Sequence, residues 1–158
     1  MKKNHWPTLA AALALPPCTG AIGAFFTKES VTTWYPALLK PPLTPPSWVF
    51  APVWTLLYIL MGLAFYLVLI SDAERTKRKL AISLFCAHLG VNVLWSFLFF
   101  GLRNPFWALV DIAVLWIMIA FLLRIFSRIN RLAATMLLPY FLWVSFASFL
   151  NYAIWRMN

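Results

Sequence analysis

Residues that could bind a ligand recur at helical spacing in this otherwise apolar chain. Two polar groups and two rings fall at i, i+4, i+7 and i+11, which is one face of a helix: His88, Asn92, Trp95 and Phe99. An earlier stretch has an aromatic stripe on one face: Ala51, Trp54, Tyr58 and Phe65. A later stretch aligns Trp143, Ala147, Leu150 and Ile154. A patch of small residues, Gly20, Ala21, Gly23 and Ala24, would let a helix or a flat ligand come close.

These faces predict an apolar, ring-lined pocket with few hydrogen-bond donors. Indole N–H groups and the Asn92 amide could orient carbonyls or carboxylates of a ligand inside it. A flat hydrophobic molecule, such as a porphyrin or a sterol, has the matching chemistry. The structural alternative is that Asn92 only bonds across helices.

Two further polar residues in the apolar stretches could have either a structural role or a role in chemistry. Asp111 shares a face with Trp107 and lies two turns after Arg103, so an ion pair or a helix cap is favoured over a catalytic acid. His88 stands alone, so a hydrogen bond between helices is favoured over ligation of a metal or haem.

Other kinds of site have no support in the sequence. The chain has no GxSxG, no HExxH and no glycine-rich phosphate loop. Its two cysteines, Cys18 and Cys86, lie in separate apolar runs without a CxxC pattern, so we expect neither a metal site nor a disulfide.

The elements that position these residues follow from where charge is missing. Only 11% of the 158 residues are charged and 63% are hydrophobic, whereas a soluble domain carries roughly a quarter charged residues. A helix needs roughly 20 apolar residues to cross about 30 Å of hydrocarbon. The uncharged stretches therefore predict one all-α membrane domain over 1–158, a bundle of five transmembrane helices near 7–26, 47–70, 80–100, 105–123 and 133–155. We read the first as a retained helix, not a cleaved signal peptide.

The net charge of +9 indicates orientation in a membrane and not binding of nucleic acid. One side of the bundle would carry nine basic residues: Lys2, Lys3, Arg75, Lys77, Arg78, Lys79, Arg124, Arg128 and Arg131. The other would carry four: Lys28, Lys40, Arg103 and Arg156. The positive-inside rule then places the N-terminus in the cytoplasm and the C-terminus outside.

A long proline-rich link, 27–46, joins the first two predicted helices. Its five prolines exclude a regular helix, and its apolar side chains indicate that it packs on something. It could lie at the lipid headgroups, but we favour a lid over the open end of the bundle. At the other end of the chain, Leu150, Tyr152 and Arg156 match a weak pattern proposed for cholesterol binding.

Several longer motifs together resemble the translocator protein / tryptophan-rich sensory protein family, once called the peripheral benzodiazepine receptor. They are Trp34-Tyr35 with LLKPPLTPPSW, APVWTLLYILMG at 51–62, Asn92-Val93-Leu94-Trp95 with LFFG at 98–101, WALVD at 107–111 and PYFLWVSFASFLNYAIWR at 139–156. They span nearly the whole chain in the family's order, and we expect a bacterial member. His88 departs from the family, which often has glutamine there.

The resemblance implies a five-helix bundle that forms homodimers in a lipid bilayer. It implies a pocket for porphyrins such as protoporphyrin IX, for sterols, and for synthetic isoquinoline carboxamides or benzodiazepines, with no required cofactor. The pocket positions it implies are Ala24, Tyr35, Phe50, Ala51, Trp54, Asn92, Trp107, Trp143, Ala147 and Leu150, and the sterol positions are Leu150, Tyr152 and Arg156.

Three functions stay open at this point. The first is a membrane sensor that binds tetrapyrroles. The second is an enzyme that degrades protoporphyrin IX in light, for which analogy with the family nominates Trp54 and Trp143. The third is a transporter of sterol or porphyrin. The expected location is the bacterial cell membrane, or the mitochondrial outer membrane in a eukaryote.

Overall fold

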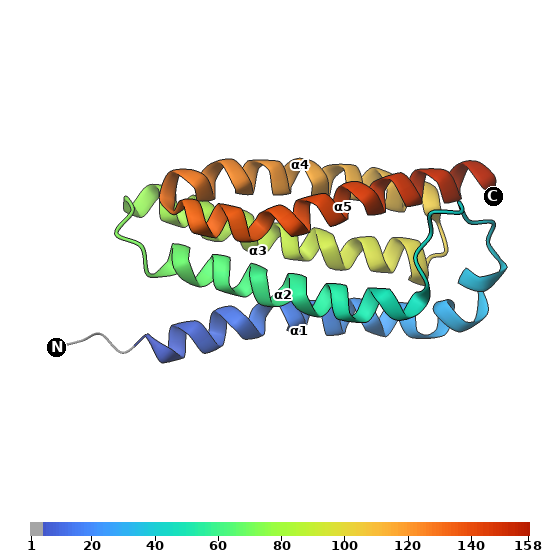
Figure 1. Ribbon diagram of the computed structural model, residues 1–158, viewed down its shortest axis with the longest axis horizontal. Helices are drawn as coiled ribbons and strands as arrows, with labels where there is room; N and C mark the ends of the chain where they lie inside the picture. The colour runs from blue at the N-terminus through green and yellow to red at the C-terminus, as the bar shows by residue number, and fades with distance from the viewer. Residues whose placement is uncertain (1–4) are drawn as a thin grey trace.

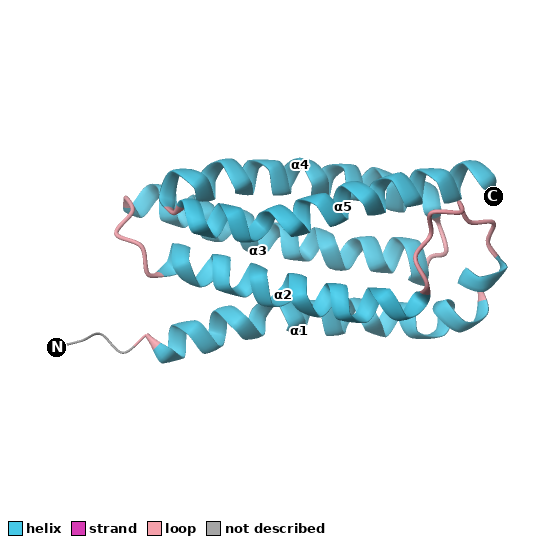
Figure 2. Ribbon diagram, in the orientation of Figure 1, coloured by secondary structure: helices cyan, strands magenta, loops and turns pink. Residues whose placement is uncertain are grey.

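The chain folds into an elongated bundle of five long helices (Figures 1 and 2). The computed structural model describes residues 5–158. Its helices are α1 (Trp6–Thr33), α2 (Ser47–Leu69), α3 (Arg75–Ser96), α4 (Pro105–Ile129) and α5 (Arg131–Met157). A short 3-10 helix, η1 (Tyr35–Ala37), follows α1, and a π-helical turn, η2 (Phe97–Gly101), extends α3. No strand occurs in the described part of the chain.

All five helices are long and apolar enough to cross a membrane. The predicted all-α fold of five transmembrane helices is therefore confirmed. Large apolar side chains cover the outside of the bundle, among them Phe25, Leu56, Phe121 and Leu142. Such a surface requires lipid as its solvent, because it would aggregate in water.

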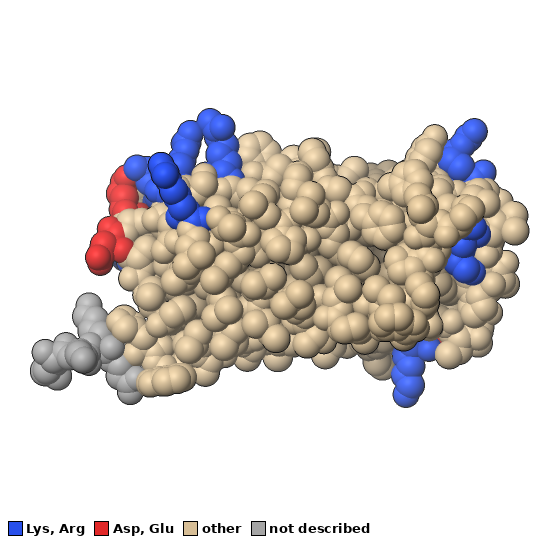
Figure 3. All heavy atoms as spheres, in the orientation of Figure 1, with Lys and Arg blue, Asp and Glu red and all other residues tan. Residues whose placement is uncertain are grey.

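The helices close into a ring in the order α1, α2, α5, α4, α3, because each packs against the next and α3 packs against α1. Successive helices run in opposite directions, so the termini lie at opposite ends (Figure 1). On the face that Figure 3 shows, basic side chains gather at both ends and the middle carries no charged side chain. Lys2 and Lys3, two of the nine predicted for the N-terminal side, lie outside the described residues.

The helices extend further than predicted. α1 continues to Thr33, α3 begins at Arg75 and α4 continues to Ile129. The predicted first link of 27–46 is thus too long, since its first seven residues are helical. Counting uncharged residues finds the part of a helix inside hydrocarbon, whereas the helix itself continues into the polar layer. α1 ends at Thr33, three residues before Pro36, because Pro36 has no N–H to bond to the carbonyl of Thr32.

Close helix packing depends on glycines, most clearly at Gly62. Pro16 removes the N–H that would bond to the carbonyl of Ala12 within α1. Gly62 of α2 packs on that carbonyl, since a Cβ at Gly62 would lie 2.9 Å from Ala12 O and 2.9 Å from Leu13 Cα. The α1–α2 contact is therefore made backbone to backbone.

We expect Gly62→Ala to destabilise the bundle by about 1–3 kcal/mol, because neither backbone neighbour can move as a side chain would. The melting temperature in detergent should fall by roughly 2–10 °C. Gly90→Ala is the matched control, because a Cβ there meets nothing within 4 Å. An unchanged melting temperature for Gly62→Ala would contradict this account of the packing.

Candidate functional site

An aromatic cluster occupies the interior between α2, α3 and α5. The ring of Phe50 lies 5.8 Å from that of Trp143, and Trp54 lies 6.3 Å from Tyr140. Asn92 Nδ2 donates a hydrogen bond of 3.2 Å to the Tyr140 hydroxyl. Three helices thus bring together residues that are far apart in the sequence. We call Phe50, Trp54, Asn92, Tyr140, Trp143 and Ala147 the aromatic site.

The side chains of the aromatic site are buried or half-buried against the core. Trp54, Trp143 and Ala147 pack against the buried core at partial exposure. Tyr140 is fully buried, and Asn92 is 7% exposed. Tyr58 lies 5.3 Å from Trp54 and fills the space beside Gly20 of α1. The glycine patch on α1 therefore receives a ring from α2 of the same chain.

The rings of the aromatic site contact one another. Two cavities resolved among the described residues lie elsewhere. One, of about 370 Å³, lies between α4 and α5, and the other, of about 160 Å³, lies beside Trp6 and Tyr66.

A second polar contact joins α3, α4 and α5, and it begins at Trp95, one turn of α3 after Asn92. Trp95 Nε1 donates to Asn151 Oδ1 at 2.9 Å, and Asn151 Nδ2 donates to the carbonyl of Pro105 at 2.8 Å. Asn151 is buried and satisfies both of its ends. This contact fixes Trp95 beneath η2, where its ring stacks on Phe99 at 5.1 Å.

The first loop covers the end of the bundle next to these contacts. Tyr35 lies 6.3 Å from Phe99 and 5.8 Å from Phe100, both in the π-helical turn. Ser30 Oγ donates to the carbonyl of Phe100 at 2.6 Å, which ties α1 to the same turn. Burial raises the pKa of the Tyr35 hydroxyl above its ordinary value, so it stays a neutral hydrogen-bonding group.

Lysine and asparagine hold the loop in place. Lys40 Nζ donates to the carbonyls of Tyr35, Pro36 and Leu38 at 2.8, 3.2 and 3.0 Å. Asn158 pairs with Leu39 through two reciprocal bonds of 3.0 Å, and it lies beyond the end of α5. The loop is thus fastened to the end of α5.

Other positions implied by the resemblance lie apart from the aromatic site. Leu150 is buried, but Ala24 and Ala51 are exposed, and Trp107 is 55% exposed with its ring against Phe106. The structure brings Phe50, Trp54, Asn92 and Trp143 together with Tyr140, and Ala147 lies one turn after Trp143 on α5. Tyr35 lies in the first loop, and Ala24, Ala51 and Trp107 lie outside the site.

The sterol positions fall on two faces of α5. Leu150 is buried, whereas Tyr152 is 50% exposed and Arg156 is exposed. Side chains two positions apart on an α-helix point about 200° apart around its axis, so Leu150 and Tyr152 lie on different faces. Tyr152 and Arg156 instead both contact Trp155. The centre of the Trp155 ring lies 6.0 Å from the centre of the Tyr152 ring and 6.0 Å from Arg156 Cζ.

Two sequence predictions about charged and polar residues are wrong. Arg103 does not pair with Asp111, because Arg103 Nη2 lies 3.6 Å from Glu29 Oε1. Arg103 precedes α4 in a turn with φ 52°, which takes its side chain toward α1. Asp111 caps no helix either, since Asn104 is the N-cap of α4 and accepts from Trp107 N at 3.2 Å. Asp111 Oδ2 is buried without a hydrogen-bond partner among the described residues.

His88 makes no hydrogen bond between helices either. Its Nδ1 donates to the carbonyl of Phe85, one turn back in α3. This bond fixes the proton on Nδ1, so Nε2 carries the lone pair. Nε2 is buried without a partner in the described structure, and no group of three potential metal-ligating side chains forms there.

Sequence reasoning missed Tyr140 and Asn151. Tyr140 lies one turn before Trp143, so the helical spacing that begins at Trp143 in the sequence analysis extends back to it. Asn151 is a polar residue in an apolar run and follows Ala147 by four residues. This helical spacing indicates that it faces the interior as Ala147 does.

Comparison with known proteins decides the family. The model of the TspO/MBR family matches residues 12–156, which include α2, α3, α4, most of α1 and α5, and the whole aromatic site. The chain belongs to the TspO/MBR family.

Relatives in the TspO/MBR family align along nearly the full chain. The tryptophan-rich protein TspO of Chlorobaculum tepidum is 40% identical over 96% of this chain and 96% of its own length. The translocator protein of Bos taurus is 35% identical over 97% of this chain and 91% of its own. The tryptophan-rich sensory protein of Cereibacter sphaeroides is 34% identical over 96% of this chain and 89% of its own length. Membership supports a membrane receptor role for this integral membrane protein.

Proposed function

We propose that the protein is a membrane receptor that binds flat, hydrophobic ligands of the porphyrin and sterol classes at the aromatic site. Protoporphyrin IX is the ligand that we expect first, and synthetic isoquinoline carboxamides or benzodiazepines should compete with it. The observation that carries the proposal is two ring contacts from α2 to α5, Phe50 with Trp143 and Trp54 with Tyr140. The Tyr140 hydroxyl also accepts a hydrogen bond from the Asn92 amide of α3.

The chemistry of the site supports a flat aromatic ligand. Aromatic rings favour stacked or edge-on contact with another π-system, and each such pair adds about 0.5–1.5 kcal/mol beyond the area it buries. The Tyr140 hydroxyl accepts from Asn92, so its proton stays available to donate. His88 Nε2 is an acceptor in the same interior, as its ring lies 5.8 Å from that of Tyr140. A pyrrole N–H is a donor that such an acceptor would suit.

A purified sample tests the proposal by absorption spectroscopy. Protoporphyrin IX should bind saturably in darkness, with a shifted Soret band. Stable binding under illumination supports a receptor, whereas loss of the band with a defined product supports an enzyme. Absence of saturable binding would refute the proposal.

The enzyme is a second candidate because two indoles belong to the aromatic site. Trp54 and Trp143 are partly buried and each contacts another ring of the site. Excited porphyrin could take an electron from such an indole or pass energy through it. Photochemical degradation would then use the same site as binding.

We also propose that the first loop acts as a lid over the ligand. Asn158→Leu should release it, because it removes the two reciprocal bonds to Leu39. Two bonds of about 1 kcal/mol each correspond to roughly 5- to 30-fold faster amide exchange in residues 37–44. Exchange measured by mass spectrometry should also slow in this segment when protoporphyrin IX binds to the unchanged protein.

The loop prediction has an internal control in the turn between α4 and α5. That turn lies at the opposite end of the bundle (Figure 1), so its exchange should be the same in both proteins. Equal exchange of residues 37–44 with and without protoporphyrin IX would remove the lid role.

Membrane location and assembly complete the proposal. We propose the bacterial cell membrane, with the N-terminus in the cytoplasm and the C-terminus outside. Seven of the described basic residues lie on the proposed cytoplasmic side, Arg75, Lys77, Arg78, Lys79, Arg124, Arg128 and Arg131, which fits the positive-inside rule. A homodimer is the assembly that we expect.

A further inference from the structure

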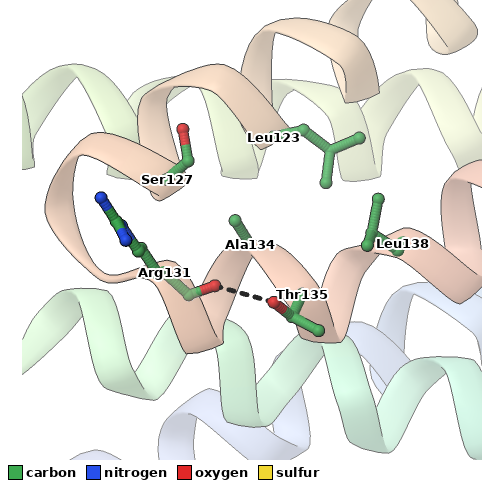
Figure 4. A pocket seen from close by; sticks show the side chains of 6 residues that line it. All are labelled: Leu123, Ser127, Arg131, Ala134, Thr135 and Leu138. Atoms are coloured by element: carbon green, nitrogen blue, oxygen red, sulfur yellow. Dashed lines mark hydrogen bonds between the residues drawn. The ribbon is translucent and has the colours of Figure 1, made fainter.

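We propose that a groove between α4 and α5 binds one anionic phospholipid. The groove has a volume of about 370 Å³ and is lined by Leu123, Ser127, Arg131, Ala134, Thr135 and Leu138 (Figure 4). It lies where α4 ends and α5 begins, at the end of the bundle with more of the basic residues. It is separate from the aromatic site and its proposed ligands.

The two ends of the groove differ in chemistry. Arg131 and Ser127 lie at the end beside the turn, and Leu123 and Leu138 lie at the other end (Figure 4). Arg131 and Leu138 are seven residues apart on α5, which corresponds to about 10 Å along the helix. A charged headgroup beside Arg131 would therefore place the start of an acyl chain along the two leucines.

Arg131 is the one group lining the groove that can donate to a phosphate. Ser127 Oγ donates to the carbonyl of Arg124 at 2.9 Å, and Thr135 Oγ1 donates to the carbonyl of Arg131 at 3.1 Å. Both hydroxyl protons are thus used within their own helices. Their lone pairs remain available to accept, which suits a headgroup that carries hydroxyls, such as glycerol.

The charge around the groove favours an anion. Among the described residues, no carboxylate lies within ion-pair distance of Arg124, Arg128 or Arg131. The acidic Glu74 at this end pairs with Lys77 at 3.1 Å instead. A basic residue at the membrane surface attracts anionic lipid, and an apolar groove beneath it holds a chain.

Native mass spectrometry of the full chain in a mild detergent tests the proposal. The probes are phosphatidylglycerol and phosphatidylcholine with identical acyl chains. We expect phosphatidylglycerol to be retained about 5-fold better or more, since one arginine beside the anionic headgroup contributes about that factor. Arg131→Gln should remove the preference. Arg75→Gln removes the same charge at the same end without lining the groove, and should keep it.

A second pair of variants tests the apolar part. Ser127→Leu fills the groove without changing charge and should lower retention of both lipids. Ser83→Leu adds the same side chain on an exposed face of α3 and should not. This pair keeps the test decisive if Arg131→Gln fails to fold.

Three results would overturn the proposal. The first is an equal preference for phosphatidylglycerol in the unchanged protein and in Arg131→Gln. The second is displacement of the lipid by inorganic phosphate with no effect of Ser127→Leu, which would make the occupant a free anion. The third is a change in the proportion of dimer in Ser127→Leu with lipid retention unaltered, which would make the occupant a second copy of the chain.

Discussion

Ala147→Thr should weaken the binding of protoporphyrin IX by roughly 5- to 150-fold, because overpacking an interior wall costs about 1–3 kcal/mol. Ala147 follows Trp143 by one turn of α5 and packs against the core at partial exposure. Threonine adds two heavy atoms where a flat ligand would lie close to the helix. A fluorescence titration in darkness gives the two dissociation constants.

Ala113→Thr is the matched control for this substitution. Ala113 is exposed on α4, away from the aromatic site, so the same added atoms should leave the dissociation constant unchanged. If Ala147→Thr binds as tightly as the unchanged protein, the ligand does not lie against this part of α5.

The second large effect concerns photochemistry. If the protein degrades protoporphyrin IX in light, Trp54→Phe and Trp143→Phe should each slow product formation strongly. Phenylalanine is much harder to oxidise than indole. It keeps an apolar ring in the same place, so the dissociation constant should stay within roughly tenfold. Parallel dark titrations and illumination of each variant separate the two quantities.

His88→Gln is the informative comparison for the tryptophan variants. The imidazole is fully buried and bonded to its own helix, and glutamine also offers an acceptor. Binding and product formation should both remain nearly intact. Loss of activity in His88→Gln alone would overturn the assignment, and full activity in both tryptophan variants would leave a protein that only binds the porphyrin.

The five helices and much of the aromatic site could be predicted because both depend on local periodicity. Four residues of the predicted pocket faces each lie on a side of their helix that turns toward the core: Trp54, Asn92, Trp143 and Ala147. Lipid removes the alternatives to a helix, so the spacing of rings along each stretch determines the face that they share.

Pairings between segments could not be predicted in the same way. Arg103 and Asp111 are two turns apart only if both belong to one helix, and Arg103 precedes α4 in a turn. Trp107 and Asp111 share a face by spacing, yet they are 55% and 7% exposed. In the first turn of α4, Ala108 is fully buried, whereas the Trp107 ring lies on the outside against Phe106.

The most direct test of the aromatic site is the NMR spectrum of tryptophan indole N–H groups during addition of protoporphyrin IX in darkness. The porphyrin ring current should shift the signals of Trp54 and Trp143, assigned from the two phenylalanine variants. Trp116, bonded to Ser145 at 2.8 Å on the outer side of α4, should not shift. Unchanged signals for Trp54 and Trp143, with shifts confined to exposed tryptophans such as Trp107 or Trp155, would show that the ligand binds on the lipid-facing surface and contradict the account.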